Sequence, residues 1–273
     1  MFSKICNLPA LDAELILPAK QILEFQENGH VLIENLLNVE EVTKYRSEIV
    51  RAVEAYNTEH RKLEDRDTYG KAFLQIMNLW TKDLAVKKFV QAKRFAKVAA
   101  DLLGVKNVRL YHDQALFKES GGGHTPWHQD QYYWPVDTTN TITMWMPLID
   151  LSEEMGILSF ASGSHKTQEI FDYAISEESH KGFDLHVKEQ NYPIVSASKM
   201  NAGDATFHYG CTIHSAAANS SKLIREIMTV IYVADGAKII EPVNQWQAND
   251  HQTWLQGFPI GGMVASDLNP LLL

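Results

Sequence analysis

The segment VRLYHDQALFK, residues 108–118, followed by the glycine-rich ESGGG of residues 119–123, decides how the second half of this chain is interpreted. Its β-branched and aromatic residues predict a strand, and the glycines predict a flexible loop. Short apolar runs between turn residues then continue toward the C-terminus, which is typical of an antiparallel sandwich or barrel. Further strands are predicted at residues 141–148, 156–160, 203–208, 212–216 and 226–233.

The N-terminal third has a mostly helical pattern. Asn38 and Glu41 have the spacing of a capping box, which predicts the start of a helix. Gly104 suits the left-handed cap that ends another helix. Helices are predicted at residues 18–27, 39–57 and 83–103, the last as one long helix, and a strand is predicted at residues 30–36.

No linker-like stretch divides the chain, so one domain of the β-rich α+β class is predicted over residues 1–273. Residues 1–104 form its mostly helical flank. Residues 105–240 form the β core, which carries a polar lid insertion near residues 165–200. Residues 241–273 are expected to form a C-terminal tail.

The composition excludes several classes of protein. Of 273 residues, 45% are hydrophobic and 22% are charged, the balance of a globular protein rather than a disordered chain. The net charge of −9 argues against nucleic acid as a partner, and no apolar run is long enough to span a membrane. The first residues lack the features of a secretory signal. The two cysteines, Cys6 and Cys211, are too few for a disulfide framework, which favours a cytoplasmic location.

Among the eleven histidines, only His128 is followed two residues later by a carboxylate, that of Asp130. On an extended strand both side chains point to the same face, so the imidazole and the carboxylate would converge on one ion. Roughly one such match is expected by chance, so the pair alone is a weak indication of a metal site.

His214 is the preferred third ligand, and His208 is the alternative. The turn-prone segment that begins at Asn219 predicts a hairpin in which His214 faces Arg225 directly. Directly opposed residues share one face of a sheet, so an imidazole and a guanidinium would both face the mouth of the barrel.

An arginine inside an apolar barrel needs an anionic partner, because a buried unpaired charge is costly. A small dicarboxylate would chelate the metal with one end and reach Arg225 with the other. The alternative is a surface salt bridge of Arg225, for example with Glu226. Two histidines and one carboxylate leave three positions open on an octahedral metal, an arrangement that points to Fe(II) oxygen chemistry. The H-E-x-x-H motif of zinc hydrolases is absent.

Three segments occur in a characteristic order: PWHQDQYYW (126–134), MWMPLIDLSEEMGILSFASGSHK (144–166) and AGDATFHYGCTIHSAAANSSKLIREIM (202–228). They resemble the phytanoyl-CoA dioxygenase family of Fe(II)/2-oxoglutarate oxygenases. The resemblance runs from about residue 23 to residue 233, which is most of the chain. It implies a double-stranded β-helix, the jelly roll of cupin-like proteins, wrapped by N-terminal helices.

The resemblance also implies roles for individual residues. Iron would be bound by His128, Asp130 and His214, and Arg225 would hold the 5-carboxylate of 2-oxoglutarate. No catalytic residue is expected beyond the metal ligands. Residues expected near the cosubstrate or the metal are Trp145 and Gln129, and candidates for the substrate pocket are Phe117, Lys118, Tyr132, Tyr133 and Trp134, with Asn78 and Trp80 as possible caps.

The implied function is that of a dioxygenase that uses Fe(II), 2-oxoglutarate and O2 to hydroxylate a small-molecule substrate, releasing succinate and CO2. Asp130 favours hydroxylation over halogenation, because related halogenases lack this carboxylate. Two alternatives remain, a non-redox metalloenzyme of the cupin type and a catalytically silent ligand-binding member of the fold. The sequence names neither the substrate nor the oligomeric state.

Overall fold

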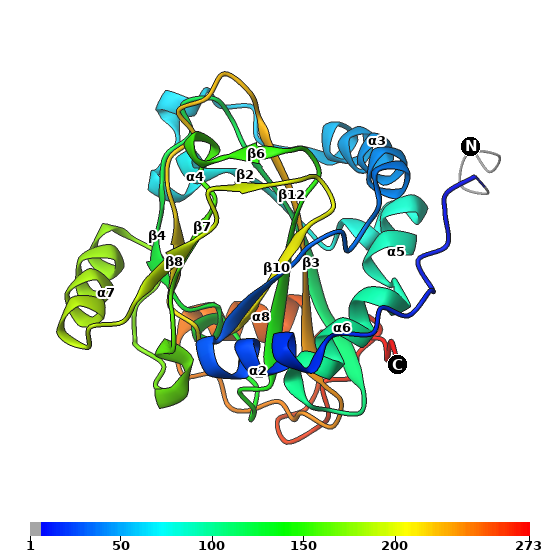
Figure 1. The fold of residues 1–273 in the computed structure, drawn as a ribbon. Helices are drawn as coiled ribbons and strands as arrows, with labels where there is room; N and C mark the ends of the chain where they lie inside the picture. Colours follow the sequence, from blue (N-terminus) through cyan, green and yellow to red (C-terminus); the bar gives the residue numbers. More distant parts are fainter. Residues whose placement is uncertain (1–6) are drawn as a thin grey trace.

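The computed structural model describes residues 7–273, apart from the side chains of residues 68 and 69, so Cys6 lies outside the described part of the chain. Two antiparallel sheets face each other, with helices on their outer sides (Figure 1). The larger sheet has six strands in the order β1-β10-β5-β12-β3-β2, and the smaller has four in the order β4-β11-β7-β8. This arrangement is the predicted jelly roll with flanking helices.

The strands alternate between the two sheets along much of the chain, as expected for a double-stranded β-helix. A separate pair, β6 and β9, closes one end (Figure 1). The strands are β1 (His30–Ile33), β2 (Leu74–Met77), β3 (Val108–Lys118), β4 (Thr125–His128), β5 (Thr141–Pro147), β6 (Leu151–Ser152), β7 (Leu158–Ala161), β8 (Ile194–Ser196), β9 (Lys199–Met200), β10 (Ala205–Tyr209), β11 (His214–Ala216) and β12 (Arg225–Ala234).

Helices α3, α5 and α6 cover the outer face of the six-stranded sheet, and α7 covers the four-stranded sheet (Figure 1). The predicted capping box is confirmed, because the side chains of Asn38 and Glu41 each accept the backbone N–H of the other residue. The helices are α2 (Ala19–Asn28), α3 (Val39–Tyr56), α4 (Thr68–Ala72), α5 (Leu84–Val90), α6 (Lys93–Leu103), α7 (Glu177–Glu189) and α8 (Gln245–Thr253), and the 3-10 turns are η1 (Leu63–Asp65), η2 (Leu79–Thr81), η3 (Asp130–Tyr133), η4 (Glu153–Met155) and η5 (Ser164–Thr167).

The single long helix predicted over residues 83–103 is wrong. The chain breaks into α5 and α6 at Ala92, whose backbone is extended, although no proline or glycine is present there. The break lets the ring of Phe95 pack 5.1 Å from that of Phe89 and brings Arg94 to the carboxylate of Glu41. Tertiary contacts therefore override a continuous helical pattern. Gly104 ends α6 in the left-handed conformation, as predicted.

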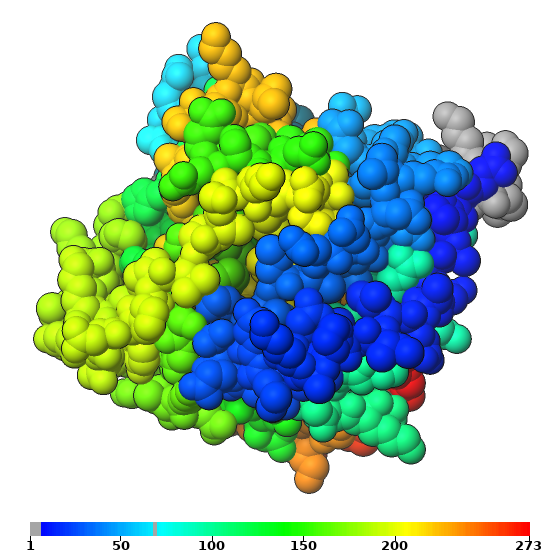
Figure 2. Space-filling model, viewed as in Figure 1, coloured from blue at the N-terminus to red at the C-terminus, as the bar shows by residue number. Residues whose placement is uncertain are grey.

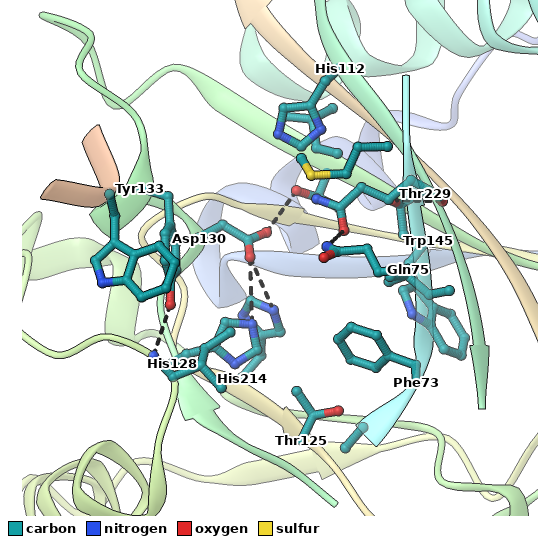
Figure 3. A pocket seen from close by; sticks show the side chains of 18 of the residues that line it. Phe73, Gln75, His112, Thr125, His128, Asp130, Tyr133, Trp145, His214 and Thr229 are labelled. Carbon is teal, nitrogen blue, oxygen red and sulfur yellow. Dashed lines mark hydrogen bonds and ion pairs between the residues drawn. The ribbon is translucent and has the colours of Figure 1, made fainter. Parts of the chain in front are cut away.

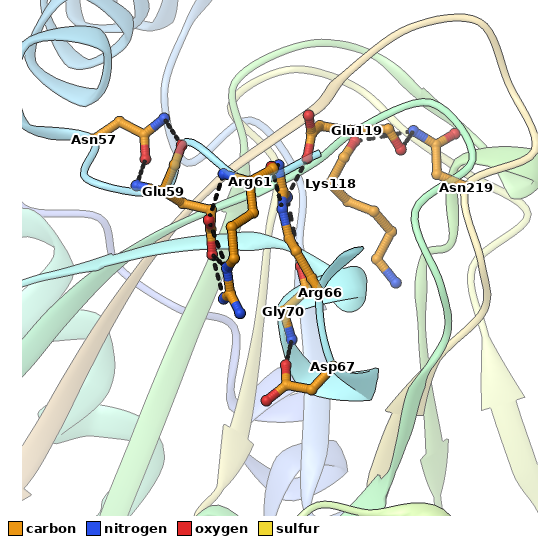
Figure 4. Close-up of polar contacts among 9 residues, drawn as sticks. All are labelled: Asn57, Glu59, Arg61, Arg66, Asp67, Gly70, Lys118, Glu119 and Asn219. Atoms are coloured by element: carbon orange, nitrogen blue, oxygen red, sulfur yellow. Dashed lines mark hydrogen bonds and ion pairs between the residues drawn. The ribbon is translucent and has the colours of Figure 1, made fainter. Parts of the chain in front are cut away.

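The hairpin that would place His214 opposite Arg225 is also wrong. β11 pairs with β4 and β7 in the smaller sheet, whereas β12 pairs with β3 and β5 in the larger sheet. The chain between them crosses from one sheet to the other. The Asn219 amide fixes this crossing by donating hydrogen bonds to the carbonyl oxygens of Lys118, Glu119 and Leu223 at 3.0, 3.1 and 2.7 Å (Figure 4).

The segment predicted as a lid near residues 165–200 contains helix α7 and the edge strand β8. The hydroxyl of Ser179 on α7 donates a hydrogen bond to the carbonyl oxygen of Trp127 on β4, so the helix is tied to the smaller sheet. In Figure 2 this yellow-green segment lies beside the blue N-terminal residues on one face of the molecule. Within residues 7–273, no helix combines the length and apolar character needed to cross a lipid bilayer.

Candidate metal centre

Two histidines face each other across neighbouring strands of the smaller sheet. His128 ends β4 and His214 begins β11, and the two residues are directly paired in the register of these strands. Their rings lie 4.1 Å apart, centroid to centroid. This pairing explains why residues 86 positions apart in the sequence converge on one point.

Asp130 completes the cluster from the first turn of η3, because β4 ends at His128. The intervening Gln129 keeps an extended backbone, so Asp130 still turns to the same side as His128. Its Oδ1 lies 3.5 Å from Nε2 of His128 and 3.7 Å from Nε2 of His214. One ligand atom from each of the three residues falls within 4.8 Å of the others, which is compact enough to surround one ion (Figure 3).

Both imidazoles are held in the tautomer that a metal requires. Nδ1 of His128 donates to the carbonyl oxygen of Pro126 at 2.8 Å, and Nδ1 of His214 donates to that of Thr212 at 2.9 Å. A carbonyl oxygen only accepts, so the proton is on Nδ1 and the Nε2 lone pair of each ring faces the cluster.

The charge state of the cluster also fits a divalent cation. Burial raises the pKa of Asp130, but the surrounding imidazoles of His214, His128 and His208 lower it further, to well below its usual range. Burial together with the neighbouring imidazoles holds the pKa of His214 well below that of a free histidine. Two imidazoles and one carboxylate are the donor set of a non-haem Fe(II) site.

Asp130 is oriented by two residues of the larger sheet. The hydroxyl of Thr143 donates to Oδ2 at 2.8 Å, and Nε2 of His208 lies 3.3 Å from the same oxygen. His208, the alternative third ligand, therefore contacts the oxygen that is turned away from the other two imidazoles. Thr143 was missed by the sequence, because nothing in TITMWMPL distinguishes this threonine from Thr141.

Arg225 lies in the same cavity and is only 1% exposed. Its guanidinium donates one hydrogen bond to the carbonyl oxygen of Gly156, while its Nε has no hydrogen-bond partner among the described residues. Burial lowers its pKa to about 9. The alternative of a salt bridge with Glu226 is wrong, since Glu226 pairs with Arg46 on the outer face of the sheet.

Trp145 and Gln129 differ in their relation to the cavity. The indole ring of Trp145 lines the cavity, with its centroid 5.4 Å from Cζ of Arg225. The Gln129 side chain points to the other side of the chain and binds the backbone of Glu169, Cys211 and Phe171. Gln129 therefore anchors the segment before α7 and does not reach the cavity, because its side chain alternates with those of its two neighbours.

The candidates for the substrate pocket divide in the same way. Tyr133 and Trp134 line the cavity, whereas Tyr132 lines a second, open cleft beside it. Phe117 is wrong as a pocket residue, because alternation along β3 places it in the core beneath the helices. Lys118 does not line the cavity either. Its side chain is buried, and its Nζ donates hydrogen bonds to the carbonyl oxygens of Gly123 and Ala217 at 2.7 and 2.9 Å.

The proposed caps Asn78 and Trp80 bind each other in the core, and β2 contributes cavity residues in their place. The C-terminal helix α8 adds further cavity residues that the sequence interpretation left in a tail. Trp246, Asp250 and Trp254 have the spacing of one helical face, which is the signal that was overlooked. The cavity has a volume of about 680 Å³. Its outer part, which lies beyond the triad and Arg225, is lined by Asp67, Phe73, Gln75, Met77, His112, Gln114, Tyr133, Trp134, Glu177, Ile231, Trp246, Asn249, Asp250, Thr253 and Trp254.

Comparisons with known proteins agree with this geometry. The family model described as phytanoyl-CoA dioxygenase (PhyH) matches residues 25–227. A probable alpha-ketoglutarate-dependent hypophosphite dioxygenase of Stutzerimonas stutzeri is 23% identical over 232 residues, covering 80% of this chain and 79% of that protein. An ectoine dioxygenase of Bordetella parapertussis is 23% identical over 235 residues, covering 79% of this chain and 75% of that protein.

Solved structures show the same fold. The alpha-ketoglutarate-dependent carbocyclase SnoK from nogalamycin biosynthesis superposes with a TM-score of 0.76 at 24% identity, covering 94% of this chain and 97% of that chain. The epimerase SnoN, in complex with Fe3+, alpha-ketoglutarate and nogalamycin RO, gives a TM-score of 0.78 at 24% identity, covering 93% and 98%. The predicted jelly roll is thereby confirmed. Because the family model spans about three quarters of the sequence, the chain belongs to the phytanoyl-CoA dioxygenase family, whose members depend on Fe(II) and 2-oxoglutarate.

Proposed function

We propose that this chain hydroxylates a small organic molecule, with 2-oxoglutarate as cosubstrate and succinate and CO2 as coproducts. His128, Asp130 and His214 would hold Fe(II), and Arg225 would hold the far carboxylate of 2-oxoglutarate. The observation that carries this proposal is a buried guanidinium that has no carboxylate partner among the described residues. It lies in the cavity that contains the two imidazoles and the carboxylate.

The buried arginine supports 2-oxoglutarate as the cosubstrate, because an unpaired guanidinium in this position is energetically costly. A buried unpaired guanidinium destabilises the folded chain, and a bidentate carboxylate is the partner that relieves this cost. The ring of Trp145 lies 5.4 Å from Cζ of the guanidinium, and the carbonyl oxygen of Gly156 accepts a hydrogen bond from it, so its orientation is fixed before any ligand arrives. A hydrolase or isomerase that uses zinc or manganese has no need for this dicarboxylate anchor.

The residues of the chain have three tasks in the proposed reaction. The triad would hold the ion, Thr143 and His208 keep Asp130 in place, and the aromatic walls exclude water. When bound, Fe(II) with 2-oxoglutarate and O2 supplies the oxidising power that converts a substrate C–H bond into C–OH. The small-molecule partner and the cytoplasmic location stay predictions.

The test uses metal-free protein that is reconstituted with Fe(II) or Zn(II) in the presence of 2-oxoglutarate and O2. Succinate formation and O2 uptake are measured, first alone and then with a metabolite library. Succinate is expected with Fe(II) only, and its rate should rise when a substrate is added. The outcome that contradicts the proposal is binding of Fe(II) without consumption of 2-oxoglutarate under any condition.

Asp130→Ala and Asp184→Ala form a matched pair for this assay. Asp130 belongs to the metal cluster, whereas Asp184 is a surface residue of α7 that pairs with Lys188. Succinate formation should disappear in the first variant and persist in the second. Equal rates in the two variants would remove the metal assignment.

A further inference from the structure

The outer part of the cavity lies on the same row of the larger sheet as the residues that orient Asp130. Across this sheet, His208 pairs with Thr143, Thr143 pairs with Ile231, and Ile231 pairs with His112. Neighbouring strands are about 4.8 Å apart, so His112 lies ~10 Å from Thr143 on the side away from β10. A molecule above His112 and Ile231 is therefore within reach of the metal cluster.

His112 offers a polar group that no residue of the described chain satisfies. The side chain is 1% exposed and lines the cavity, and its Nδ1 has no hydrogen-bond partner among the described residues. Burial lowers its pKa to about 4, so the imidazole is neutral and offers one donor and one acceptor. An orphaned polar atom in a buried position is costly unless a ligand completes it.

Aromatic rings form the walls around this group. The ring of His112 lies 6.2 Å from that of Trp254 and 6.3 Å from that of Trp134. Tyr133 and Trp246 stand edge to face at 5.8 Å nearer the opening, where Trp246 is half-exposed. Such walls suit a substrate that is largely apolar and contains a ring, since aromatic pairs add attraction beyond their buried area.

The charges around the outer part of the cavity select against anions. Its acidic residues are Asp67, Glu177 and Asp250, and no lysine lines the cavity as described; the one lining arginine is Arg225. Asp67 and Glu177 are exposed. Nε2 of His124 lies 3.4 Å from the carboxylate of Glu177, but this imidazole does not line the cavity.

Asp250 lies deeper and behaves differently from the two exposed carboxylates. It is bound by the hydroxyl of Tyr111, and burial raises its pKa to about 8. Most of its population is therefore an uncharged acid at neutral pH. The inner end of the substrate region is neutral and its opening is negative, so an anionic group would be desolvated there without a counter-charge.

We propose that the primary substrate is an uncharged or cationic, ring-containing organic molecule that hydrogen-bonds to His112, and that compounds with phosphate or carboxylate groups are excluded. This substrate class rests on the proposed function, because it takes Arg225 to be occupied by 2-oxoglutarate. A cavity of about 680 Å³ is in the size range of sites for drug-sized molecules, so it has room for such a molecule beside the cosubstrate.

Three matched probes test the charge selection: 4-phenylbutylamine, 4-phenylbutan-1-ol and 4-phenylbutyrate. Each is titrated without O2 into the Fe(II)-loaded protein with 2-oxoglutarate, and binding is followed by the visible charge-transfer absorbance of the metal and by tryptophan fluorescence. The amine and the alcohol should bind at least about tenfold more tightly than the carboxylate. A carboxylate that binds as tightly as the others, or a cavity that takes none of the three up to their solubility limits, would overturn the proposal.

Two variants make the test specific. Glu177→Gln should reduce the difference in affinity by which the amine binds more tightly than the alcohol. Glu189→Gln, at the far end of the same helix and outside the cavity, should leave this difference unchanged. His112→Phe should weaken the binding of the alcohol, while the binding of 2-oxoglutarate is unchanged. If 2-oxoglutarate gives no charge-transfer band before any probe is added, the proposed function has failed, which distinguishes that outcome from a failure of the substrate class.

Discussion

Arg225 and Glu226 are consecutive residues of β12, but they lie on opposite faces of the larger sheet. On the outer face, Glu226 accepts two hydrogen bonds from Arg46, at 2.6 and 2.7 Å, so its charge is satisfied within the chain. On the inner face, Arg225 is more deeply buried and yet has no carboxylate partner among the described residues. Polar groups on this face that have no hydrogen-bond or charge partner in the fold mark the position of a ligand.

β3 shows the same difference one strand away. Asp113, on the outer face, accepts the backbone N–H groups of Leu79 and Trp80 at 3.2 and 3.3 Å. Its neighbour His112, on the inner face, keeps an unpaired Nδ1. The outer face is thus organised for stability and the inner face for binding, and substitutions on the two faces should have separable effects.

The largest effect is expected for His214→Ala, compared with His208→Ala. Loss of a metal ligand should weaken Fe(II) binding by more than about 100-fold, the upper limit for residues that only support a ligand, and abolish succinate formation. His208→Ala removes a contact to Oδ2 of Asp130 and should cost roughly tenfold. Metal titration with activity as a second readout decides between them, and a larger loss in His208→Ala would exchange their roles.

Arg225→Gln and Glu226→Gln compare the two faces directly. Removing the inner-face charge should cost about 2–2.7 kcal/mol of cosubstrate binding, roughly a 30- to 100-fold rise in the dissociation constant of 2-oxoglutarate. Removing the outer-face charge should cost about 1 kcal/mol or less of folding free energy, because Arg46 is half-exposed, and should leave binding unchanged. Anaerobic titration and urea unfolding measure the two quantities, and equal binding by both variants would break the comparison.

Thr143→Val and Thr229→Val separate support of the metal cluster from ordinary packing. Thr143 donates to Asp130, whereas Thr229, two strands from β10 on the same face, donates to the carbonyl oxygen of Gln114. The first change should reduce Fe(II) affinity about tenfold, and the second should not alter it. Isothermal titration with Fe(II) measures this difference in affinity. An equal loss of Fe(II) affinity in both variants would refute the role of Thr143 in supporting the metal cluster.

The smallest effect concerns stability and pH. Burial raises the pKa of Asp113 to about 7, although two backbone N–H groups oppose this shift. Above pH ~4 the unfolded chain has lost a proton that the folded chain keeps up to about pH 7, so this residue makes stability fall as pH rises through that window. In the Asp113→Asn variant, the side chain at this position does not ionise between pH ~4 and about pH 7. From pH 6 to pH 7, the unfolding free energy of the natural protein should fall by about 1 kcal/mol relative to that of the variant. A relative change in the opposite direction would exclude the raised pKa of Asp113.

Local patterns in the sequence predicted the parts of the site that depend on a few neighbouring residues. The spacing of His128 and Asp130 and the capping box at Asn38 each involve residues two or three positions apart. The predicted strand over residues 108–118 matches β3 at both ends. Such features are determined by backbone geometry over one turn or one pleat, so they are readable without knowledge of the rest of the fold.

The remaining features depend on which sheet each strand joins. The sequence between His214 and Arg225 has every local sign of a hairpin, yet the chain crosses between sheets there. Phe117 was predicted to line the pocket because it precedes the glycine loop on a strand expected to border the mouth of the barrel, but alternation along β3 turns it outward. The contribution of α8 to the cavity required knowledge that the C-terminal segment returns to η3, where Gln247 contacts Tyr132 and Trp246 contacts Tyr133.

The central claim is that Arg225 recognises the far carboxylate of a 2-oxo acid bound at the triad. The direct measurement is anaerobic titration of the Fe(II)-loaded protein and of Arg225→Gln with 2-oxoglutarate and with 2-oxobutyrate, which lacks only that carboxylate. The account predicts that the natural protein prefers 2-oxoglutarate by roughly 30- to 100-fold and that this preference collapses in the variant. Equal affinity for the two acids in the natural protein, or an unchanged preference in Arg225→Gln, would contradict it.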